Sequence, residues 1–306
     1  MNYIELSQAI QNYAENTESL FVASIPTFVQ EAERRIYNSV QIPALRKNVT
    51  GAMTPSNKYV SLPNDWLANY SLAVIDATGA YKYLLNKDVN FLRESYPSPT
   101  TTGQPKYYAL FGSQYADQNE LSLIVAPTPD TAYPMELHYF YYPVSIVQGV
   151  ITAMDGITAG TGYNTGTYYN VPLSNGSGMF ATATIVVAGG GVTSVTINDG
   201  GSFYVVGDVL TATNTYIGGA GTLFTVTVLT VNNTSGTSWL GDNYDPVLFY
   251  GAMREAVLFM KGEQDMVAYY EKMYMEAMGE LKRLGDGLER NDAYRQGQTS
   301  LPYKGL

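Results

Sequence analysis

The sequence predicts an α+β protein: a helical bundle from the N- and C-terminal helices, an antiparallel β-sheet or barrel region, and an inserted small all-β domain. Three observations lead to this prediction. Apolar residues recur every three or four positions near both ends of the chain. Short runs of Tyr, Val, Ile and Leu alternate with turn residues between these ends. A later stretch is rich in Gly and Thr and nearly uncharged.

Two helices are expected in the first 42 residues. In the first, Tyr3, Leu6, Ile10 and Tyr13 fall on one face. The second is expected from Pro26, in the first helical turn, to about Val40. Its apolar face would hold Phe28, Ala32 and Ile36, and its solvated or partner-facing side Gln30, Glu31, Glu33 and Arg34.

Residues 43–148 read as the β region. Residues 71–75 and 80–85 flank a turn at 76–79, which predicts a hairpin. Asp88 is placed to cap a short helix that ends near Tyr96, and the Pro/Thr/Gly cluster at 97–105 predicts a loop. Three further strands are expected at 106–111, 120–125 and 135–142. Together they predict a modest antiparallel sheet or barrel.

Helices return over 240–290. Asp245 and Pro246 suit a helix start, Leu248, Ala252, Ala256 and Phe259 form a face, and Gly262 predicts a break. The last helix has the clearest period, and Gly285 and Gly287 are expected to end it. Its apolar positions are Val267, Tyr270, Tyr274, Ala277, Leu281 and Leu284. Residues 291–306 lack periodicity and are expected to form an extended arm.

Residues 149–232 differ in composition from the rest. They hold more than half of the 29 glycines but only three charged residues, all Asp. The segment also repeats itself at offsets of 41 and 43 residues: Tyr163 to Thr167 matches Tyr204 to Asp208, and Gly176 to Val186 matches Gly219 to Leu229. This pattern predicts a pseudo-symmetric β domain with glycine turns. The alternative is a flexible Gly-rich linker, although linkers lack such alternating β runs.

The predicted host is therefore 1–148 with 233–290, in which the helices on both sides of the insertion share one bundle. The composition sets limits on its chemistry. A net charge of −10 argues against affinity for DNA phosphates, and the absence of Cys rules out thiolate catalysis and Cys-based zinc sites. The N-terminus does not read as a secretion signal, and no apolar run is long enough to span a bilayer. We expect synthesis in a cytoplasm and no membrane partner.

No catalytic, cofactor-binding or metal-binding residues are predicted. His138, the single histidine, alternates with apolar neighbours on an expected strand and is interpreted as structural. The loop at 160–166 misses the spacing of a nucleotide-binding motif, and the Asp residues of 149–232 miss that of calcium repeats. A glycosidase would need a pair of carboxylates that the spacing does not single out.

Patches in the host resemble, in order, the head-to-tail adaptor, or tail tubular protein A, of short-tailed bacteriophages. They are residues 26–48, the Leu-Pro-Asn-Asp-Trp-Leu run at 62–67, the strands at 103–108, 123–129 and 138–143, and 239–256. The resemblance covers roughly 20–148 and 235–290, whereas the 84-residue insertion lies outside the compact family pattern.

The resemblance implies a virion protein of the neck, made in the host bacterial cytoplasm. It implies a cyclic homo-oligomer, a 12-mer, that docks between the portal protein and the tail nozzle protein and lets DNA pass without specific binding. As in family tails, the C-terminal arm would contact a neighbouring subunit or the portal. Its expected anchors are Tyr294, Arg295, Leu301, Pro302 and Tyr303.

The sequence leaves three roles open for the insertion. It could be a spacer, contact a tail fibre or neighbouring tail protein, or bind glycans. The last option defines an alternative function, a tail-associated carbohydrate-binding or receptor-contact protein. The residues expected to make such contacts are Tyr163, Tyr168, Tyr169 and Tyr204.

Overall fold

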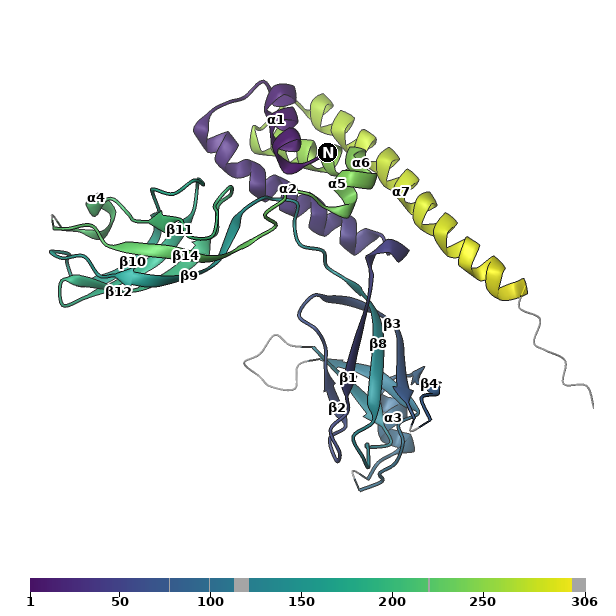
Figure 1. The fold of residues 1–306 in the computed structure, drawn as a ribbon. Coiled ribbons are helices and arrows are strands. Elements are labelled where there is room, and N and C mark those ends of the chain that lie inside the picture. Colours follow the sequence, from purple (N-terminus) through teal and green to yellow (C-terminus); the bar gives the residue numbers. More distant parts are fainter. Residues whose placement is uncertain (77, 99, 113–120, 220, 299–306) are drawn as a thin grey trace, which may run out of the picture. The chain divides into compact units, whose positions relative to one another are not determined.

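The computed structural model describes residues 1–76, 78–98, 100–112, 121–219 and 221–298, with side chains up to Gly285 (Figure 1). The chain forms two compact units. Unit 1 comprises Met1–Val40 and Val144–Leu284, and unit 2 comprises Gln41–Pro143 and Gly285–Leu306. The mixture of helices and antiparallel sheets confirms the α+β class, and none of the described sheets closes into a barrel.

The helices of unit 1 come from both ends of the chain and pack together, as predicted. In Figure 1 the purple N-terminal helices lie beside the green and yellow C-terminal ones. Gly251 sits where three of them meet, since an added Cβ would lie 3.0 Å from Ala32 and 3.2 Å from Tyr274. The helices are α1 (Tyr3–Ala14), α2 (Ser19–Ser39), α5 (Trp239–Asn243), α6 (Asp245–Phe259) and α7 (Gln264–Gln298).

Helix α1 follows its sequence period, but α2 begins earlier than predicted. An Asn2–Glu5 capping box starts α1, and Tyr3, Leu6 and Ile10 are buried, whereas Tyr13 is exposed. Helix α2 starts at Ser19, so Pro26 lies inside the helix rather than in its first turn. The apolar face of α2 continues upstream through buried Phe21 and Ile25, and this burial outweighs the helix-breaking tendency of proline.

At the C-terminal end, the predicted break at Gly262 is confirmed between α6 and α7, but the predicted end of α7 is wrong. The helix continues through Gly285 and Gly287 to Gln298, so residues 291–298 are helical rather than extended. Two helical glycines cost about 1 kcal/mol each, and the good helix formers around them, such as Leu284 and Leu288, offset this. Residues 299–306 lie outside the described part of the chain.

Unit 2 is a sandwich of two four-stranded sheets. One sheet has the order β1-β8-β3-β4 and the other β2-β7-β6-β5, and a short helix accompanies the second. The strands are β1 (Arg46–Ala52), β2 (Tyr59–Ser61), β3 (Trp66–Ile75), β4 (Tyr81–Tyr83), β5 (Leu85–Asn86), β6 (Tyr107–Gly112), β7 (Ser122–Ala126) and β8 (Pro134–Tyr141), with the 3-10 turn η1 (Pro43–Leu45) and helix α3 (Val89–Ser95).

Strand β7 shows why this unit has three layers. All five of its residues are buried. Leu123 and Val125 face the core between the two sheets, whereas Ile124 and Ala126 face a second core with Leu92 of α3. Because side chains alternate along a strand, a continuous apolar run marks a strand covered on both faces.

The predicted hairpin at 76–79 and the Asp88 cap of α3 are confirmed. Strand β1 was not predicted. Its sequence is Arg-Lys-Asn-Val-Thr-Gly-Ala, and six of its seven residues are exposed, so no apolar alternation marks it. It is an edge strand, held in place by backbone pairing with β8.

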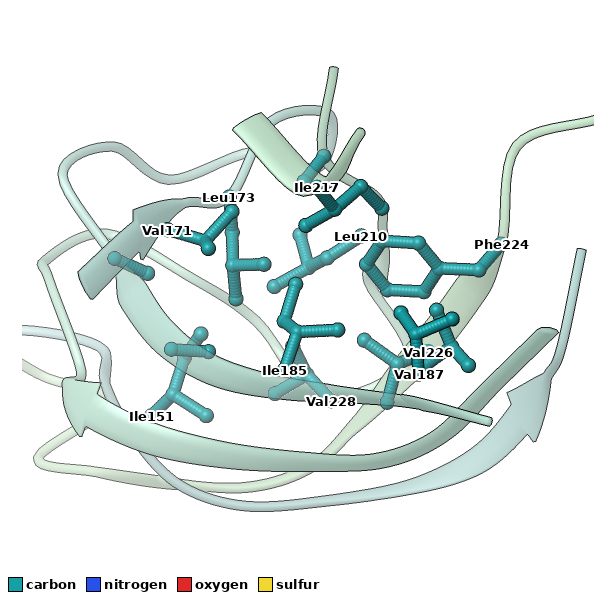
Figure 2. Close-up of a cluster of buried hydrophobic side chains, with 14 of the residues drawn as sticks. Ile151, Val171, Leu173, Ile185, Val187, Leu210, Ile217, Phe224, Val226 and Val228 are labelled. Carbon is teal, nitrogen blue, oxygen red and sulfur yellow. The ribbon is translucent and has the colours of Figure 1, made fainter. Parts of the chain in front are cut away.

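The Gly-rich segment of unit 1 is a folded β-sandwich, so the flexible-linker alternative is wrong. Its three-stranded sheets have the orders β10-β11-β12 and β13-β14-β9. Figure 2 shows side chains such as Ile151, Ile185, Phe224 and Val228 meeting in one core. The elements are β9 (Val150–Thr158), β10 (Gly166–Pro172), β11 (Thr182–Ala188), β12 (Gly191–Asp199), β13 (Val209–Leu210), β14 (Thr225–Asn232) and helix α4 (Asn214–Ile217).

The sequence repeat extends further than the turn and strand that reveal it. Strands β9 and β12 begin 41 residues apart, so each copy supplies three strands: β9, β10 and β11, then β12, β13 and β14. Strand β12 pairs with β11 of the first copy, and β9 pairs with β14 of the second. The two copies therefore exchange one strand, and each sheet contains strands of both.

Two glycines at equivalent positions of the repeat allow the backbones of the two copies to come into close contact. Gly160 and Gly201 both have positive φ, at 65° and 59°. An added Cβ would lie 2.5 Å from the Thr222 carbonyl oxygen at the first and 2.3 Å from that of Met179 at the second. These distances are too short for any side chain, so both positions require glycine for conformation and for space.

The segment begins and ends on neighbouring strands, since Val150 pairs with Asn232. It also contacts helix α1. The Tyr3 ring lies 5.3 Å from the Phe203 ring, and its hydroxyl is hydrogen-bonded to Ser202. Tyr3 is 1% exposed and its pKa is raised, chiefly by burial. The β-sandwich therefore covers part of α1.

Candidate partner-binding surfaces

The predicted C-terminal anchors fall largely outside the part that can be described. Tyr294 and Arg295 lie on the helical backbone of α7, but their side chains are beyond the described ones. Leu301, Pro302 and Tyr303 lie outside the described residues altogether. Partner contact by these five residues stays a prediction, now placed partly on a helix.

Two of the four tyrosines expected to form a contact surface on the β-sandwich are in its core. Tyr163 and Tyr204 are 4% and 2% exposed. The Phe224 N–H donates to the Tyr163 hydroxyl at 2.8 Å, and the Ala181 N–H donates to the Tyr204 hydroxyl at 3.4 Å. Each repeat thus supplies a hydroxyl that accepts a backbone hydrogen bond from the other.

The remaining two tyrosines differ from each other. The Tyr168 hydroxyl donates to the Asn164 carbonyl at 3.0 Å, and its ring packs partly against the core. Tyr169 is 73% exposed. Tyr163 and Tyr204 occupy equivalent positions in the two copies of the repeat. Aromatic residues at equivalent repeat positions mark shared packing, so this match indicated that both side chains are buried in the core. A glycan surface built on four tyrosines is therefore not present.

The helices carry the large exposed apolar side chains that a protein interface requires. Leu20 is 69% exposed at the start of α2, and Tyr269 is 53% exposed on α7. Others on helices α1, α6 and α7 are Ile4, Tyr13, Leu258, Phe259, Met266, Met275 and Leu284. Aromatic residues and Met are enriched at protein interfaces. Spacing predicted that Tyr13, Phe259 and Leu284 lie on the apolar faces of their helices, and the structure shows that all three are exposed.

Charges fix these helices relative to one another. Arg35 of α2 pairs with Glu255 of α6 at 2.8 Å, and Arg254 contacts both Glu255 and Glu271 of α7. Glu31 pairs with Arg34 at the surface. This ionic chain links three helices and leaves their apolar outer positions to face solvent.

Glu33 lies on the face of α2 that was expected to be solvated or to contact a neighbour, and the structure shows that it is buried. Its carboxylate accepts a hydrogen bond from the Ile146 N–H at 2.9 Å and another from the Ser145 side chain. Burial raises its pKa to about 7, and the two hydrogen bonds partly oppose that shift. The Ser145 carbonyl in turn accepts from the Asn233 side chain at 2.7 Å. Glu33 thus holds the segment that precedes β9.

The His138 Nε2 lies 3.0 Å from the Glu136 carboxylate, so its ring has a hydrogen-bond partner. The same carboxylate accepts hydrogen bonds from the side chains of Asn48 and Tyr81. Within the described ranges, no group of three or more His, Cys, Asp or Glu side chains could hold a metal ion. Among these same residues, no helix has the length and apolar character that crossing a membrane requires.

Comparison with known families gives a match to the SU10 adaptor protein family over residues 1–153. A search of curated proteins returned no match. The family match covers α1, α2 and the whole of unit 2's sandwich, and it ends in strand β9. The chain belongs to the SU10 adaptor protein family, the head-to-tail adaptors of bacteriophages, and so has the structural role of a phage adaptor in the virion neck.

Proposed function

We propose that this adaptor forms a ring between the portal and the tail nozzle of a short-tailed phage, with DNA passing through the ring. The family match over residues 1–153 carries the proposal. The ring contains several copies, with twelve as our expectation, and each copy contacts the next through different faces. The tail tubular protein A-like architecture and synthesis in the bacterial host's cytoplasm belong to the same proposal.

The exposed apolar side chains of the helices support such an assembly. Cyclic contacts need surfaces that exclude water, and apolar side chains exposed on the helices can supply such surfaces. The net charge of −10 suits a conduit, because an acidic lumen repels DNA phosphates and lets the genome slide.

We further propose that residues 149–232 are an insertion in the host formed by 1–148 and 233–290. The buried core of this segment consists of its own residues, and its ends pair side by side. We assign the insertion to contact with a tail fibre, made through Tyr169, the exposed tyrosine of the set.

The test is mass photometry and negative-stain microscopy of the full chain, alone and mixed with the portal protein of the same virus. We expect particles of about 0.4 MDa, the mass of twelve 33.5-kDa chains, with a central hole. Leu20→Glu and Tyr269→Glu should reduce assembly, whereas Tyr169→Glu on the β-sandwich should not. A 33.5-kDa species under both conditions would refute the ring.

A further inference from the structure

Unit 2 carries a small cationic pocket that neither the adaptor role nor the ring accounts for. It has a volume of about 30 Å³ and lies between α3 and the sheet beneath it. It is lined by the apolar residues Leu92 and Ile124 and by the cationic residues Lys58 and Arg93. Ser98 and Thr128 add hydroxyl groups.

The walls of the pocket are fixed by the fold. The Lys58 carbonyl accepts from the Val125 N–H at 2.9 Å, which holds Lys58 against strand β7. Asp88 caps α3 through the Asn90 N–H at 2.9 Å, and Leu92 of the same helix is 2% exposed. The pocket is therefore a stable feature of the third layer of the sandwich.

The two cations lack a carboxylate partner among the residues described. Instead, the Lys58 amine lies 5.5 Å from the Tyr59 ring centre, and the Arg93 guanidinium lies 5.4 Å from that of Phe111. The two rings are themselves 5.2 Å apart. Cation–π contacts position these charges but leave their hydrogen-bond donors available. Among the described residues that line the pocket there is no Asp or Glu.

We propose that this pocket binds a carboxylate side chain of a partner protein, presented by an acidic segment. A void of about 30 Å³ holds a small polar group such as a carboxylate. The planar guanidinium of arginine matches a carboxylate with two parallel hydrogen bonds. Half-buried Tyr96 also lines the pocket, and aromatic residues are enriched at protein interfaces.

The net charge of the chain strengthens this choice. In a protein with 27 acidic and 17 basic residues, two cations that have no carboxylate partner among the described residues, and that lie beside apolar side chains, mark a site for a negative group. Binding here does not require ring formation, so the proposal can succeed or fail independently of the one above.

The test uses the side-chain Nε–H signals of the eight arginines in ¹⁵N-labelled full-length protein, with hexaglutamate, inorganic phosphate and a thymidine hexamer as probes. We expect hexaglutamate to shift the Arg93 signal more than the others. Arg93→Gln and Lys58→Gln should each weaken binding at least 5-fold. Lys82→Gln, which removes a cation already paired with Asp76 at 3.5 Å, should change it less than 2-fold.

Three results would overturn the proposal. In the first, the Arg93 signal shifts no more than that of Arg46. In the second, phosphate binds as tightly as hexaglutamate, which would make the pocket a simple anion site. In the third, the thymidine hexamer binds more tightly with a steep salt dependence, which would assign the surface to nucleic acid. Far-UV circular dichroism of the variants confirms that each is folded.

Discussion

The chain contains two β-sandwiches, and they are built by different means. In unit 2, large side chains such as Leu123 and Tyr139 fill the space between the sheets, and α3 covers the outer face of one of them. In the 149–232 sandwich, glycines bring backbone against backbone, as at Gly160 and Gly201. The first tolerates charge on its surface, whereas the second carries three Asp and no Lys or Arg. Large side chains that fill the core specify one sandwich, and glycines that leave room for close backbone contacts specify the other.

The largest expected effect concerns Gly201→Ala. The new methyl group would approach the Met179 carbonyl oxygen to 2.3 Å at a positive φ, so we expect the 149–232 sandwich to lose about 4 kcal/mol or more. The control is Gly207→Ala, which has positive φ but no atom within 4 Å and should cost about 1–2 kcal/mol. Amide hydrogen exchange of β11 and β14 measures both. Equal losses would show that space is not the constraint.

The matching change in unit 2 is Leu123→Ala. Leu123 is fully buried between the two sheets, and removing it creates a cavity that we expect to cost about 3 kcal/mol. Hydrogen exchange should rise in β3, β7 and β8 and stay unchanged in β11 and β14. Leu110→Ala, at a position that is 45% exposed on neighbouring β6, should cost less than about 1 kcal/mol. A uniform rise across both sandwiches would contradict the separation of their cores.

A third prediction concerns pH and the segment between the two sandwiches. Because the pKa of Glu33 is about 7 when folded and 4.5 in its ordinary state, the folded protein retains a proton that the unfolded chain releases. The contribution of Glu33 to stability should be greatest below pH 4.5, fall as pH rises to about 7, and then level off, a difference of about 3 kcal/mol.

Hydrogen exchange at the Ile146 amide, which donates to Glu33, measures this pH dependence of stability locally. Glu33→Gln keeps an oxygen acceptor but cannot titrate, so this dependence should disappear in the variant. Surface Glu31→Gln serves as the control and should leave it intact. A pH profile unchanged by Glu33→Gln would contradict the assignment.

The smallest expected effects concern the two hydrogen bonds that a tyrosine of one repeat copy accepts from the backbone of the other. Tyr163→Phe leaves the buried Phe224 N–H without its acceptor and should cost about 1–2 kcal/mol. Tyr204→Phe should cost less, because its bond to the Ala181 N–H is longer, 3.4 Å against 2.8 Å. Chemical denaturation of both variants ranks them. The reverse order would show that these hydroxyls do not act as described.

Much of the fold could be predicted because its elements follow simple periods. The helices at both ends, the 76–79 hairpin and the repeat in 149–232 are marked by spacing or self-similarity. Strand β1 could not be found, because an exposed edge strand is specified by its partner β8 rather than by its own residues. The full lengths of α2 and α7 were missed because Pro26 and Gly285 are local stop signals that did not decide the helix ends. Burial of Phe21 and Ile25 outweighs the proline in α2, and the good helix formers around the glycines offset their cost in α7.

The candidate surfaces were harder to predict than the fold. Spacing placed Tyr13 and Leu284 on apolar faces, but it does not say where a face meets the edge of the molecule. Tyrosine suits both cores and surfaces, so composition alone did not separate buried Tyr163 from exposed Tyr169. The cationic pocket joins Lys58 to Arg93, which are distant in sequence and become neighbours through the sheet order.

The pairing of Val150 with Asn232 has a mechanical consequence. Tension applied through the two ends of the 149–232 sandwich would act across β9 and β14, and their hydrogen bonds would open one after another rather than all at once. Under tension the β9–β14 pair should therefore separate at low force. The pairing of β11 with β12 would still connect the two copies of the repeat.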